Sequence, residues 1–431
     1  MIENKEEIEY VILVAVDTGD EKAGKNYGDR PTRDVKSSLD ELAELAETAG
    51  AVVVGRMIQK LPSFNASTYI GSGKIEELKW KILDRGATGI ITDDELNPAQ
   101  MHNLSKALDI KVMDRTMVIL DIFAAHARTA EGKLQVELAQ LQYRLSRLTG
   151  KGISMSRLGG GIGTRGPGEK KLEQDRRVIR NRVAQLKREL DDVVAHRELT
   201  RKGREMGETP VFAIVGYTNV GKSTLLNALT GADILAENKL FATLDTTTRV
   251  YEYSRESSNS KQKVLLTDTV GFIRKLPHNL IDAFRSTLEE VCYSDYIIHV
   301  VDASSEERLS EMHVVYETLD MLLKGGSKKI ITIFNKIDKL ENPDDKLGLL
   351  DKRASAVLQI SAKKQIGLDE ISKVIDGILR EDREYVEMLI DYKDMAKLAK
   401  IKARGEVIQE EYQDGGVFVK AYIPREFHNF E

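Results

Sequence analysis

The segment Gly216–Ser223, Gly-Tyr-Thr-Asn-Val-Gly-Lys-Ser, restricts the fold of this chain more than any other feature. An apolar stretch over Pro210–Val215 precedes it, and a helical stretch over Thr224–Leu229 follows it. This spacing between a strand and a helix is typical of a phosphate-binding loop in an α/β domain. The glycines allow backbone N–H groups to surround a polyphosphate, and the following helix points its positive end at the same anion.

The side chains of this loop suit a nucleotide that is bound with magnesium. Lys222 is expected to neutralise β- and γ-phosphate oxygens, and the Ser223 hydroxyl is expected to hold Mg²⁺. Asn219 has two interpretations that stay open: it holds a potassium ion beside the phosphates, or it only ties the loop together. The nucleotide-binding residues predicted in this loop are Gly216, Asn219, Val220, Gly221, Lys222, Ser223 and Thr224.

Two downstream motifs predict that the base is guanine. The apolar stretch Ile330–Phe334 ends in Asn335-Lys336-Ile337-Asp338, where the Asp338 carboxylate can accept hydrogen bonds from guanine N1–H and the 2-amino group. Adenine lacks this pair of donors. Asn335 is expected to meet the purine edge or to brace the phosphate loop, and the Lys336 stem to lie along the base. After the short strand Ala356–Ile360, the segment Ser361-Ala362-Lys363 offers the Ala362 N–H to guanine O6.

Two further segments are expected to sense the γ-phosphate. In Asp268-Thr269-Val270-Gly271, Asp268 can bind Mg²⁺ through water and the Gly271 N–H can meet the γ-phosphate. The segment Leu240–Thr248 offers threonine hydroxyls for a second magnesium contact, and the residues alone do not choose among them. Phe272 follows Gly271 and cannot orient a water as glutamine does in many GTPases, so we expect slow hydrolysis until a partner, a cation or a rearranged loop completes the site.

Residues 1–128 alternate short apolar strands with helical stretches, which predicts a small α/β domain with a parallel sheet. The expected strands are Tyr10–Val16, Ala51–Gly55, Gly89–Thr92 and Ile110–Met113, and the expected helices are Val35–Ala49, Ile75–Arg85 and Pro98–Leu108. Within this region, Gly71-Ser72-Gly73-Lys74 either holds an anion or is a turn that enters a helix. The turn is favoured because the longer spacing of a phosphate loop is missing.

Residues 129–207 are predicted to form an antiparallel helical hairpin. Leucines recur at steps of three and four from Leu134 to Leu148, and a second amphipathic run covers Glu169–Thr200. The connector at 150–168 is rich in glycine and cannot pack a core of its own.

The hairpin region is strongly basic. From Gln142 to Arg204 there are 17 Lys and Arg against seven Asp and Glu. Such an excess indicates a phosphate-rich partner, the alternative being a solvated basic helix face. We predict that the glycine-rich tip enters folded RNA and recognises its shape and backbone, through Arg157, Arg165, Lys170 and Lys171.

Beyond the hairpin we expect the nucleotide domain at 208–380 and a small α+β domain at 381–431. The latter should have a helix near Tyr385–Lys402 and strands at Gly405–Ile408 and Gly416–Ile423.

Composition narrows the class of protein. The 431 residues include 64 Lys and Arg against 69 Asp and Glu, so the chain as a whole is not drawn to nucleic acid, and no DNA partner is expected. Cys292 is the only cysteine, which excludes an intrachain disulfide. The polar, acidic start of the chain is unlike a signal peptide, and no apolar run reaches the roughly 18 residues of a membrane span. We therefore expect a cytoplasmic monomer.

Three segments together resemble the HflX family of GTPases: the glycine-rich Gly159–Glu169, then Phe241–Asp245, then Asp268–Phe272. The resemblance covers about residues 10–380. It implies that Thr243 is the second magnesium ligand. With the residues argued above, the predicted catalytic set is Lys222, Thr243, Gly271 and Asn219. The nucleotide site is then completed by Phe241, Ala242, Thr243, Leu244, Asp245, Asp268, Thr269, Val270, Gly271, Asn335, Lys336, Ile337, Asp338, Ser361, Ala362 and Lys363.

The same resemblance implies a function. Members of the family bind the large ribosomal subunit, split stalled or idle ribosomes under stress, and hydrolyse GTP faster when that subunit is bound. The N-terminal domain of the family is also linked to ATP binding, and Gly71–Leu78 is similar to part of that domain. Two alternatives stay open: a checkpoint GTPase in large-subunit assembly, and a regulatory GTPase with a protein or membrane partner.

Overall fold

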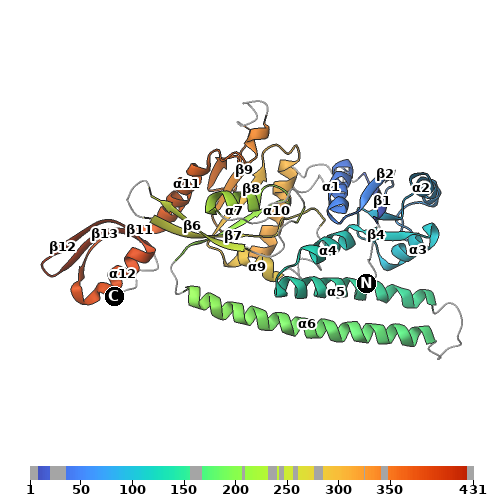
Figure 1. The fold of residues 1–431 in the computed structure, drawn as a ribbon, viewed down its shortest axis with the longest axis horizontal. Helices are drawn as coiled ribbons and strands as arrows, with labels where there is room; N and C mark the ends of the chain where they lie inside the picture. The colour runs from blue at the N-terminus through green and yellow to red at the C-terminus, as the bar shows by residue number, and fades with distance from the viewer. Residues whose placement is uncertain are drawn as a thin grey trace, which may run out of the picture.

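The computed structural model describes residues 8–19, 35–155, 167–205, 209–231, 240–241, 247–255, 261–275, 285–324, 326–340 and 348–424. Three units that each contain a β-sheet lie in a row, and two long helices run along one side of the row (Figure 1). Among the described residues, no helix has both the length and the hydropathy that crossing a bilayer requires.

The N-terminal unit is a parallel α/β domain, as predicted. Its four-stranded sheet has the order β2-β1-β3-β4. Strand β1 is apolar on both faces because helices cover both: α1 and α4 pack on one side, and α2 and α3 on the other. The elements are β1 (Tyr10–Asp17), α1 (Val35–Thr48), β2 (Val52–Lys60), α2 (Ser72–Arg85), β3 (Gly89–Thr92), α3 (Pro98–Leu108), β4 (Lys111–Asp114) and α4 (Arg115–His126).

Helix α4 was not expected from the sequence. It begins directly after β4 without a loop, and the Asp114 side chain caps it by accepting a hydrogen bond from the Met117 N–H at 3.0 Å. Asp114 is completely buried, so the strand end and the helix start form one rigid corner.

The two long helices are α5 (Ala130–Met155) and α6 (Pro167–Glu205), and they lie side by side (Figure 1). Leu138 and Leu186 are buried at their contact, and Arg182 forms a bidentate ion pair with Glu137 at 2.7 and 2.9 Å. The predicted connector is shorter than expected, because α5 continues helically to Met155, past Gly150 and Gly152. Residues 156–166 at the tip lie outside the described part of the chain.

The central unit has a six-stranded sheet with the order β10-β9-β8-β5-β7-β6, in which only β6 runs antiparallel to its neighbour. Helices α7 and α11 pack on one face, while α9 and α10 cover the other. The elements are β5 (Val211–Gly216), α7 (Lys222–Thr230), β6 (Thr247–Ser254), β7 (Lys261–Asp268), α9 (Arg285–Tyr293), β8 (Tyr296–Asp302), α10 (Arg308–Leu323), β9 (Ile330–Asn335), the short helix η3 (Ile337–Lys339), β10 (Ala356–Gln359) and α11 (Leu368–Glu381).

The C-terminal unit is a small α+β domain, as predicted, with one element assigned wrongly. The expected helix from Tyr385 is a strand, because alternate residues of Arg383–Asp391 face the domain core and solvent; the helix begins only at Met395. The antiparallel sheet has the order β11-β13-β12, with α12 packed on one face. The elements are β11 (Arg383–Asp391), the short helix η5 (Tyr392–Asp394), α12 (Met395–Arg404), β12 (Glu406–Gln413) and β13 (Gly416–Pro424).

Candidate nucleotide-binding site

The loop between β5 and α7 has a backbone that two glycines make possible. Gly216 has φ 157°, and a Cβ added there would lie 2.3 Å from the Val300 carbonyl oxygen. Gly221 has φ 96°, and a Cβ there would lie 2.5 Å from Asn335 Nδ2. Both positions therefore require glycine, and the loop is held against the ends of β8 and β9.

The ammonium group of Lys222 lies inside this loop. It donates to the backbone oxygens of Tyr217 at 2.7 Å and of Gly216 at 3.3 Å, and the residue is only 6% exposed. Burial lowers the pKa of Lys222 to about 8. A phosphate placed in the loop would favour the charged form, since a nearby anion opposes the effect of burial.

The two described candidates for magnesium ligation are already in contact. The Ser223 hydroxyl donates to Asp268 Oδ2 at 2.7 Å, which places two oxygen ligands at the start of α7. Mg²⁺ prefers such hard oxygen ligands and keeps several waters, so this pair fits the ion. Thr243, with its neighbours Ala242, Leu244 and Asp245, lies outside the described residues.

The segment after β7 is tied to the phosphate loop. Thr269 donates its hydroxyl to the Ile214 carbonyl at 2.7 Å. Phe272 exchanges backbone hydrogen bonds with the loop, accepting from Thr218 N at 2.9 Å and donating to Gly216 O at 3.1 Å. A Cβ on Gly271 would lie 2.9 Å from Lys222 Nζ, so only glycine brings this backbone so close to the ammonium. Val270 and the Phe272 ring are both buried.

The two guanine motifs meet at the ends of β9 and β10. The Asn335 side chain braces the phosphate loop, donating to Val220 O at 2.9 Å, and Lys336 Nζ donates to Asn219 O at 2.7 Å. The exposed Asp338 accepts from the Ser361 hydroxyl at 2.6 Å, which lowers the pKa of the Asp338 carboxyl. The Ala362 N–H, expected to face guanine O6, donates to Asn335 Oδ1 at 2.9 Å in this structure. Ile337 and Lys363 belong to the same two loops.

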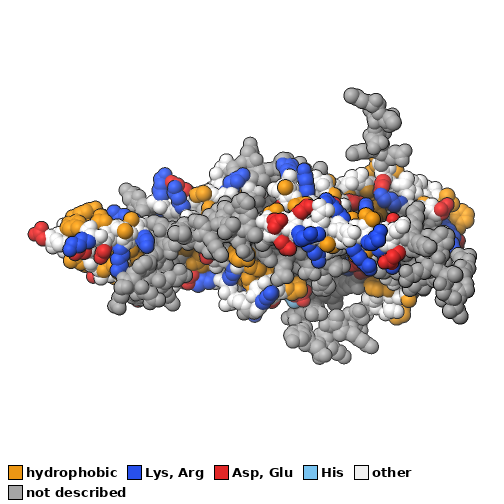
Figure 2. Space-filling model, turned by 90° about the horizontal axis from the view of Figure 1, so that it is seen from below, with side chains coloured by type: hydrophobic (Ala, Val, Ile, Leu, Met, Phe, Trp, Pro, Cys, Tyr) orange, Lys and Arg blue, Asp and Glu red, His pale blue; other side chains and the backbone are white. Residues whose placement is uncertain are grey.

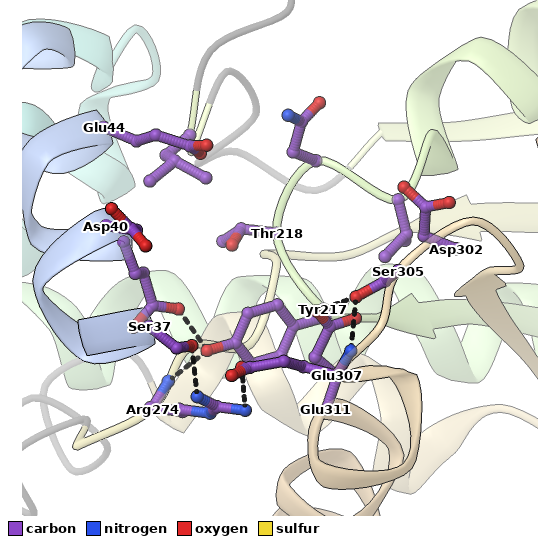
Figure 3. A pocket seen from close by; sticks show the side chains of 14 residues that line it. Ser37, Asp40, Glu44, Tyr217, Thr218, Arg274, Asp302, Ser305, Glu307 and Glu311 are labelled. Carbon is purple, nitrogen blue, oxygen red and sulfur yellow. Dashed lines mark hydrogen bonds and ion pairs between the residues drawn. The ribbon is translucent and has the colours of Figure 1, made fainter. Parts of the chain in front are cut away.

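An acidic cavity of about 270 Å³ separates the phosphate loop from helix α1 of the N-terminal domain (Figure 3). Burial, together with Glu41 nearby, raises the pKa of Glu44 on the cavity wall. A polyphosphate would be repelled by these carboxylates, so phosphates are expected on the Lys222 side of the loop. The acidic residues of the lining are Asp40, Glu41, Glu44, Asp302, Glu307 and Glu311.

Arg115, which contacts Glu41 of the cavity wall, joins the N-terminal domain to the segment after Gly271. Its guanidinium is buried and donates to Glu41 at 2.7 Å, to Asp93 at 3.0 Å and to the Arg274 carbonyl at 3.1 Å. Lys275 forms ion pairs with Asp93 and, at 2.9 Å, with Asp94. No sequence pattern indicated this network, because its members are far apart along the chain and belong to no motif.

The predicted RNA contacts are largely outside what the structure describes. Arg157 and Arg165 lie in 156–166, and Lys170 and Lys171 are on α6 without described side chains. The described part of α6 adds a basic stripe that sequence reasoning did not single out. The residues of this stripe are all exposed: Arg177, Arg180, Lys187 and Arg188.

At the start of α2 in the N-terminal domain, the segment Gly71-Ser72-Gly73-Lys74 has the geometry of a turn that enters a helix. The Gly71 N–H donates to the Gln59 side chain at 2.9 Å, and Lys74 pairs with Glu77 at 2.6 Å. ATP binding in this domain stays a prediction. No group of three or more candidate metal ligands occurs among the described residues.

Comparison with known proteins identifies the family of the chain. A curated GTPase HflX from Lacrimispora saccharolytica is 56% identical over 99% of this chain and 96% of its own length. The chain belongs to the HflX family of GTPases. A GTPase HflX from Caldanaerobacter subterraneus subsp. tengcongensis is 49% identical over 90% of this chain and 88% of its own length.

Three segments of this HflX-family chain match described families in order. Residues 36–124 match the GTP-binding GTPase N-terminal family, 126–204 the GTP-binding GTPase middle region, and 211–336 the family described as 50S ribosome-binding GTPase. A solved GTP-binding protein from Sulfolobus solfataricus in complex with GDP is 27% identical, covering 86% of this chain and 98% of that one, with a TM-score of 0.43. The membership of the HflX family and the match of residues 211–336 make the protein a GTP-binding P-loop GTPase.

Proposed function

We propose that this HflX-family GTPase uses bound GTP to set the pose of its helical hairpin on the large ribosomal subunit, and so separates stalled or idle ribosomes. The observation that carries this proposal is a continuous series of polar contacts between the nucleotide loops and the hairpin. Hydrolysis, slow in the free protein and faster on the subunit, then releases it.

The nucleotide loops have defined tasks in this proposal. Lys222 binds the phosphates, Asp338 selects guanine, and the Gly271 N–H meets the γ-phosphate. Ser223, Asp268 and Thr243 would hold Mg²⁺, which when bound neutralises charge on the β- and γ-phosphates. Asn219 is the candidate ligand for K⁺. Because Phe272 is buried at 2% exposure and has no polar group, we expect the ribosome to complete the hydrolytic site.

The first half of the connection runs from the segment after Gly271 to the N-terminal domain. Arg274 and Lys275 follow Phe272 after one residue, Ile273, and they contact Arg115 and Asp93 through the buried network described above. When the γ-phosphate attracts the Gly271 N–H, the backbone of this segment shifts. Arg274 and Lys275 must then shift with the segment, or their contacts must resist its movement. The N-terminal domain is therefore sensitive to the third phosphate.

The second half runs from the N-terminal domain to the hairpin. Asp114 Oδ2 accepts from the Arg147 guanidinium at 2.7 Å and from the Tyr143 hydroxyl at 2.9 Å, and both residues are on α5. Arg147 also pairs with Glu95 at 3.4 Å, two residues beyond Asp93. The loop Asp93–Glu95 thus contacts both the nucleotide segment and the hairpin, so a shift at one end has a physical route to the other.

The described part of α6 offers RNA several exposed cationic side chains. The exposed stripe on α6 adds charges to those of the glycine-rich tip. Lys and Arg side chains at this spacing contact phosphates without reading sequence. This fits attachment to folded rRNA.

Cosedimentation with purified ribosomal subunits tests the proposal. The intact protein should pellet with the large subunit when loaded with a non-hydrolysable GTP analogue, and much less with GDP or without nucleotide. Equal pelleting in all three states would falsify the coupling between nucleotide and hairpin. Incubation with intact ribosomes and GTP should release free subunits; binding without release would instead favour the role in subunit assembly.

Two variants test nucleotide binding and subunit binding separately. Lys222→Ala should lose GTP binding and, with it, the nucleotide-dependent pelleting. A variant in which Arg177, Arg180 and Lys187 are changed to Gln should bind GTP normally but pellet less. As a matched control, Lys79→Gln with Lys81→Gln removes charge from α2 at the far side of the N-terminal domain and should behave as the intact protein.

A further inference from the structure

The cavity between the phosphate loop and helix α1 concentrates negative charge. Six of its lining residues are acidic and one, Arg274, is basic. This excess is local, because the chain as a whole has 69 acidic and 64 basic residues. Figure 2 shows a similar mixture on the outside, where Lys and Arg side chains are interspersed with Asp and Glu on the face that it presents. The cavity is therefore a place to which a cation is attracted.

Two of the six carboxylates are not ion-paired within the described part of the chain: Glu44 on α1 and Glu311 on α10. Burial raises the pKa of both carboxyls, and the neighbouring Glu41 and Asp302 add to this effect. A cation bound in the cavity would stabilise their charged forms. The other four carboxylates each pair with an arginine or lysine of this chain: Asp40 with Arg56, Glu41 with Arg115, Asp302 with Lys336 and Glu307 with Arg274.

Thr218 of the phosphate loop adds an unused hydrogen-bonding group to the cavity wall. It lines the cavity, and its side chain projects from the loop toward α1 (Figure 3). The residue is 6% exposed, and its hydroxyl oxygen has no hydrogen-bond partner among the residues that the structure describes. The methyl group approaches the segment after β7, since a Cβ on Gly271 would lie 2.9 Å from Thr218 Cγ2. A buried hydroxyl without a partner is unfavourable, and an N–H donor in the cavity would satisfy it.

The size of the cavity indicates an organic cation rather than a bare metal ion. Its volume is about 270 Å³, and no group of three or more candidate metal ligands occurs among the described residues. A guanidinium or alkylammonium group carries several N–H donors on a stem, so it can reach acceptors that are too far apart for one metal ion. The acceptors here are carboxylates of two domains and the Thr218 hydroxyl.

We propose that this cavity binds an organic cation, a guanidinium or alkylammonium group, that bridges helix α1 and the phosphate loop. An arginine or lysine side chain of a partner protein supplies the charge, or a free polyamine does. Contact with both walls stabilises the docked arrangement of the N-terminal and central domains. Because Thr218 adjoins Gly271, the bound cation also places positive charge beside the nucleotide site. Binding of such a cation needs only the free protein, not its proposed role on the ribosome.

Calorimetric titration of the GDP-bound, full-length protein at constant ionic strength tests this site with two probes. Argininamide represents the arginine side chain and spermidine the free polyamine. At least one should bind, and the tighter binder indicates the source of the cation. In E44Q/E311Q, binding should weaken by about tenfold or more, because charge-assisted hydrogen bonds are lost. Thr218→Val should weaken binding by about threefold to tenfold, and Thr218→Ser, which keeps the oxygen, by much less.

The matched control is E387Q/E411Q, which makes the same charge change at exposed positions of the C-terminal domain and should bind the probes as the intact protein does. Unchanged thermal unfolding shows that each variant is folded. Failure of both probes to bind the intact protein, or equal binding to E44Q/E311Q and the control, would overturn the inference. So would a response to K⁺ with neither probe bound, which would assign the cavity to a metal ion. None of these measurements involves ribosomes, so the proposed function stands or fails separately.

Discussion

Tyr217, the second residue of the phosphate loop, donates a hydrogen bond from its phenolic hydroxyl to Glu41 on helix α1 and accepts one from the Arg274 backbone N–H at 2.9 Å. One hydroxyl therefore joins the phosphate loop, the N-terminal domain and the segment after Gly271 (Figure 3). Burial, together with Glu41, raises the pKa of Tyr217 well above its usual value, so the hydroxyl stays protonated and keeps donating.

Removing this hydroxyl should loosen the contact between the two domains. Tyr217→Phe leaves buried polar groups without their partner, and we expect a loss of about 1–3 kcal/mol in the free energy of unfolding. Hydrogen exchange should speed up in α1 and near Arg274. Tyr385→Phe is the matched control, because its hydroxyl contacts Glu387 on the exposed face of β11. A Tyr217→Phe protein as stable as this control would contradict the prediction.

Arg115 should be essential to stability. Arg115→Met leaves Glu41 and Asp93 near the domain contact without their shared cation, and breaking such a buried pair typically costs about 3–5 kcal/mol. Urea unfolding measures the change. Arg353→Met, which breaks the exposed pair with Asp320, should cost about 1 kcal/mol or less.

The network around Asp93 also predicts how the stability of the protein changes at acidic pH. Burial would raise the pKa of Asp93, but Arg115 and Lys275 outweigh it and lower that pKa below its ordinary value of 3.8. A carboxyl with a lowered folded pKa stabilises the protein above its unfolded pKa, and this stability is lost as pH falls through the folded pKa. The stability gap between intact protein and Arg115→Met should therefore be widest above pH 3.8 and narrow in stronger acid.

Base selection should depend on Asp338. Asp338→Asn replaces a double acceptor by an amide and should weaken GDP binding by roughly 10²-fold or more, since two hydrogen bonds to a charged group are lost. The amide can instead donate to the 2-oxo group of xanthine, so binding of xanthosine diphosphate should improve. Calorimetry with both nucleotides checks this, and an unchanged preference for guanine would refute the role of Asp338.

Nucleotide affinity should fall in mild alkali. The pKa of Lys222 is lowered to about 8 by burial, so above that pH the free protein carries a neutral amine where the phosphates bind. Binding must then take up a proton, and affinity should drop about tenfold for each pH unit above 8. Proton uptake measured in buffers of different ionisation enthalpy is an independent check. Constant affinity across this range would contradict the assignment of Lys222.

The free protein should show the opposite trend in stability over the same range. Between pH 8 and 10.5 the unfolded chain holds a proton on this lysine that the folded chain has released. The contribution of Lys222 to the stability of the nucleotide-free protein should therefore rise with pH between 8 and 10.5.

The sequence predicted those parts of the fold that local patterns determine. Apolar runs such as Gly89–Thr92 became strands with the expected bounds, and the phosphate loop identified a P-loop domain. The segment Arg383–Asp391 was wrongly predicted to be helical because its charged and apolar residues also fit an amphipathic helix. It forms a strand because it pairs with β13. Helix α4 was missed because no loop separates it from β4.

The nucleotide-binding site, like the fold, could be predicted where local motifs determine it. Ser223 and Asp268, which are 45 positions apart, could be expected to meet because their motifs carry known tasks around one phosphate chain. Arg115, Glu41 and Asp93 could not, since nothing in the residues around each one marks it as a partner of the others. Such contacts depend on how two domains dock, which local sequence does not encode.

The phenyl ring of Phe241, at the start of the segment expected to bind the γ-phosphate, packs edge-on against Phe123 of α4 with 4.7 Å between ring centroids. The apolar cluster that holds them continues from the N-terminal sheet into the central one. A fragment cut between these units would present that cluster to water and would tend to aggregate. Biochemical work on the nucleotide loops is therefore best done with both units retained, since excising one removes part of the interior of the other.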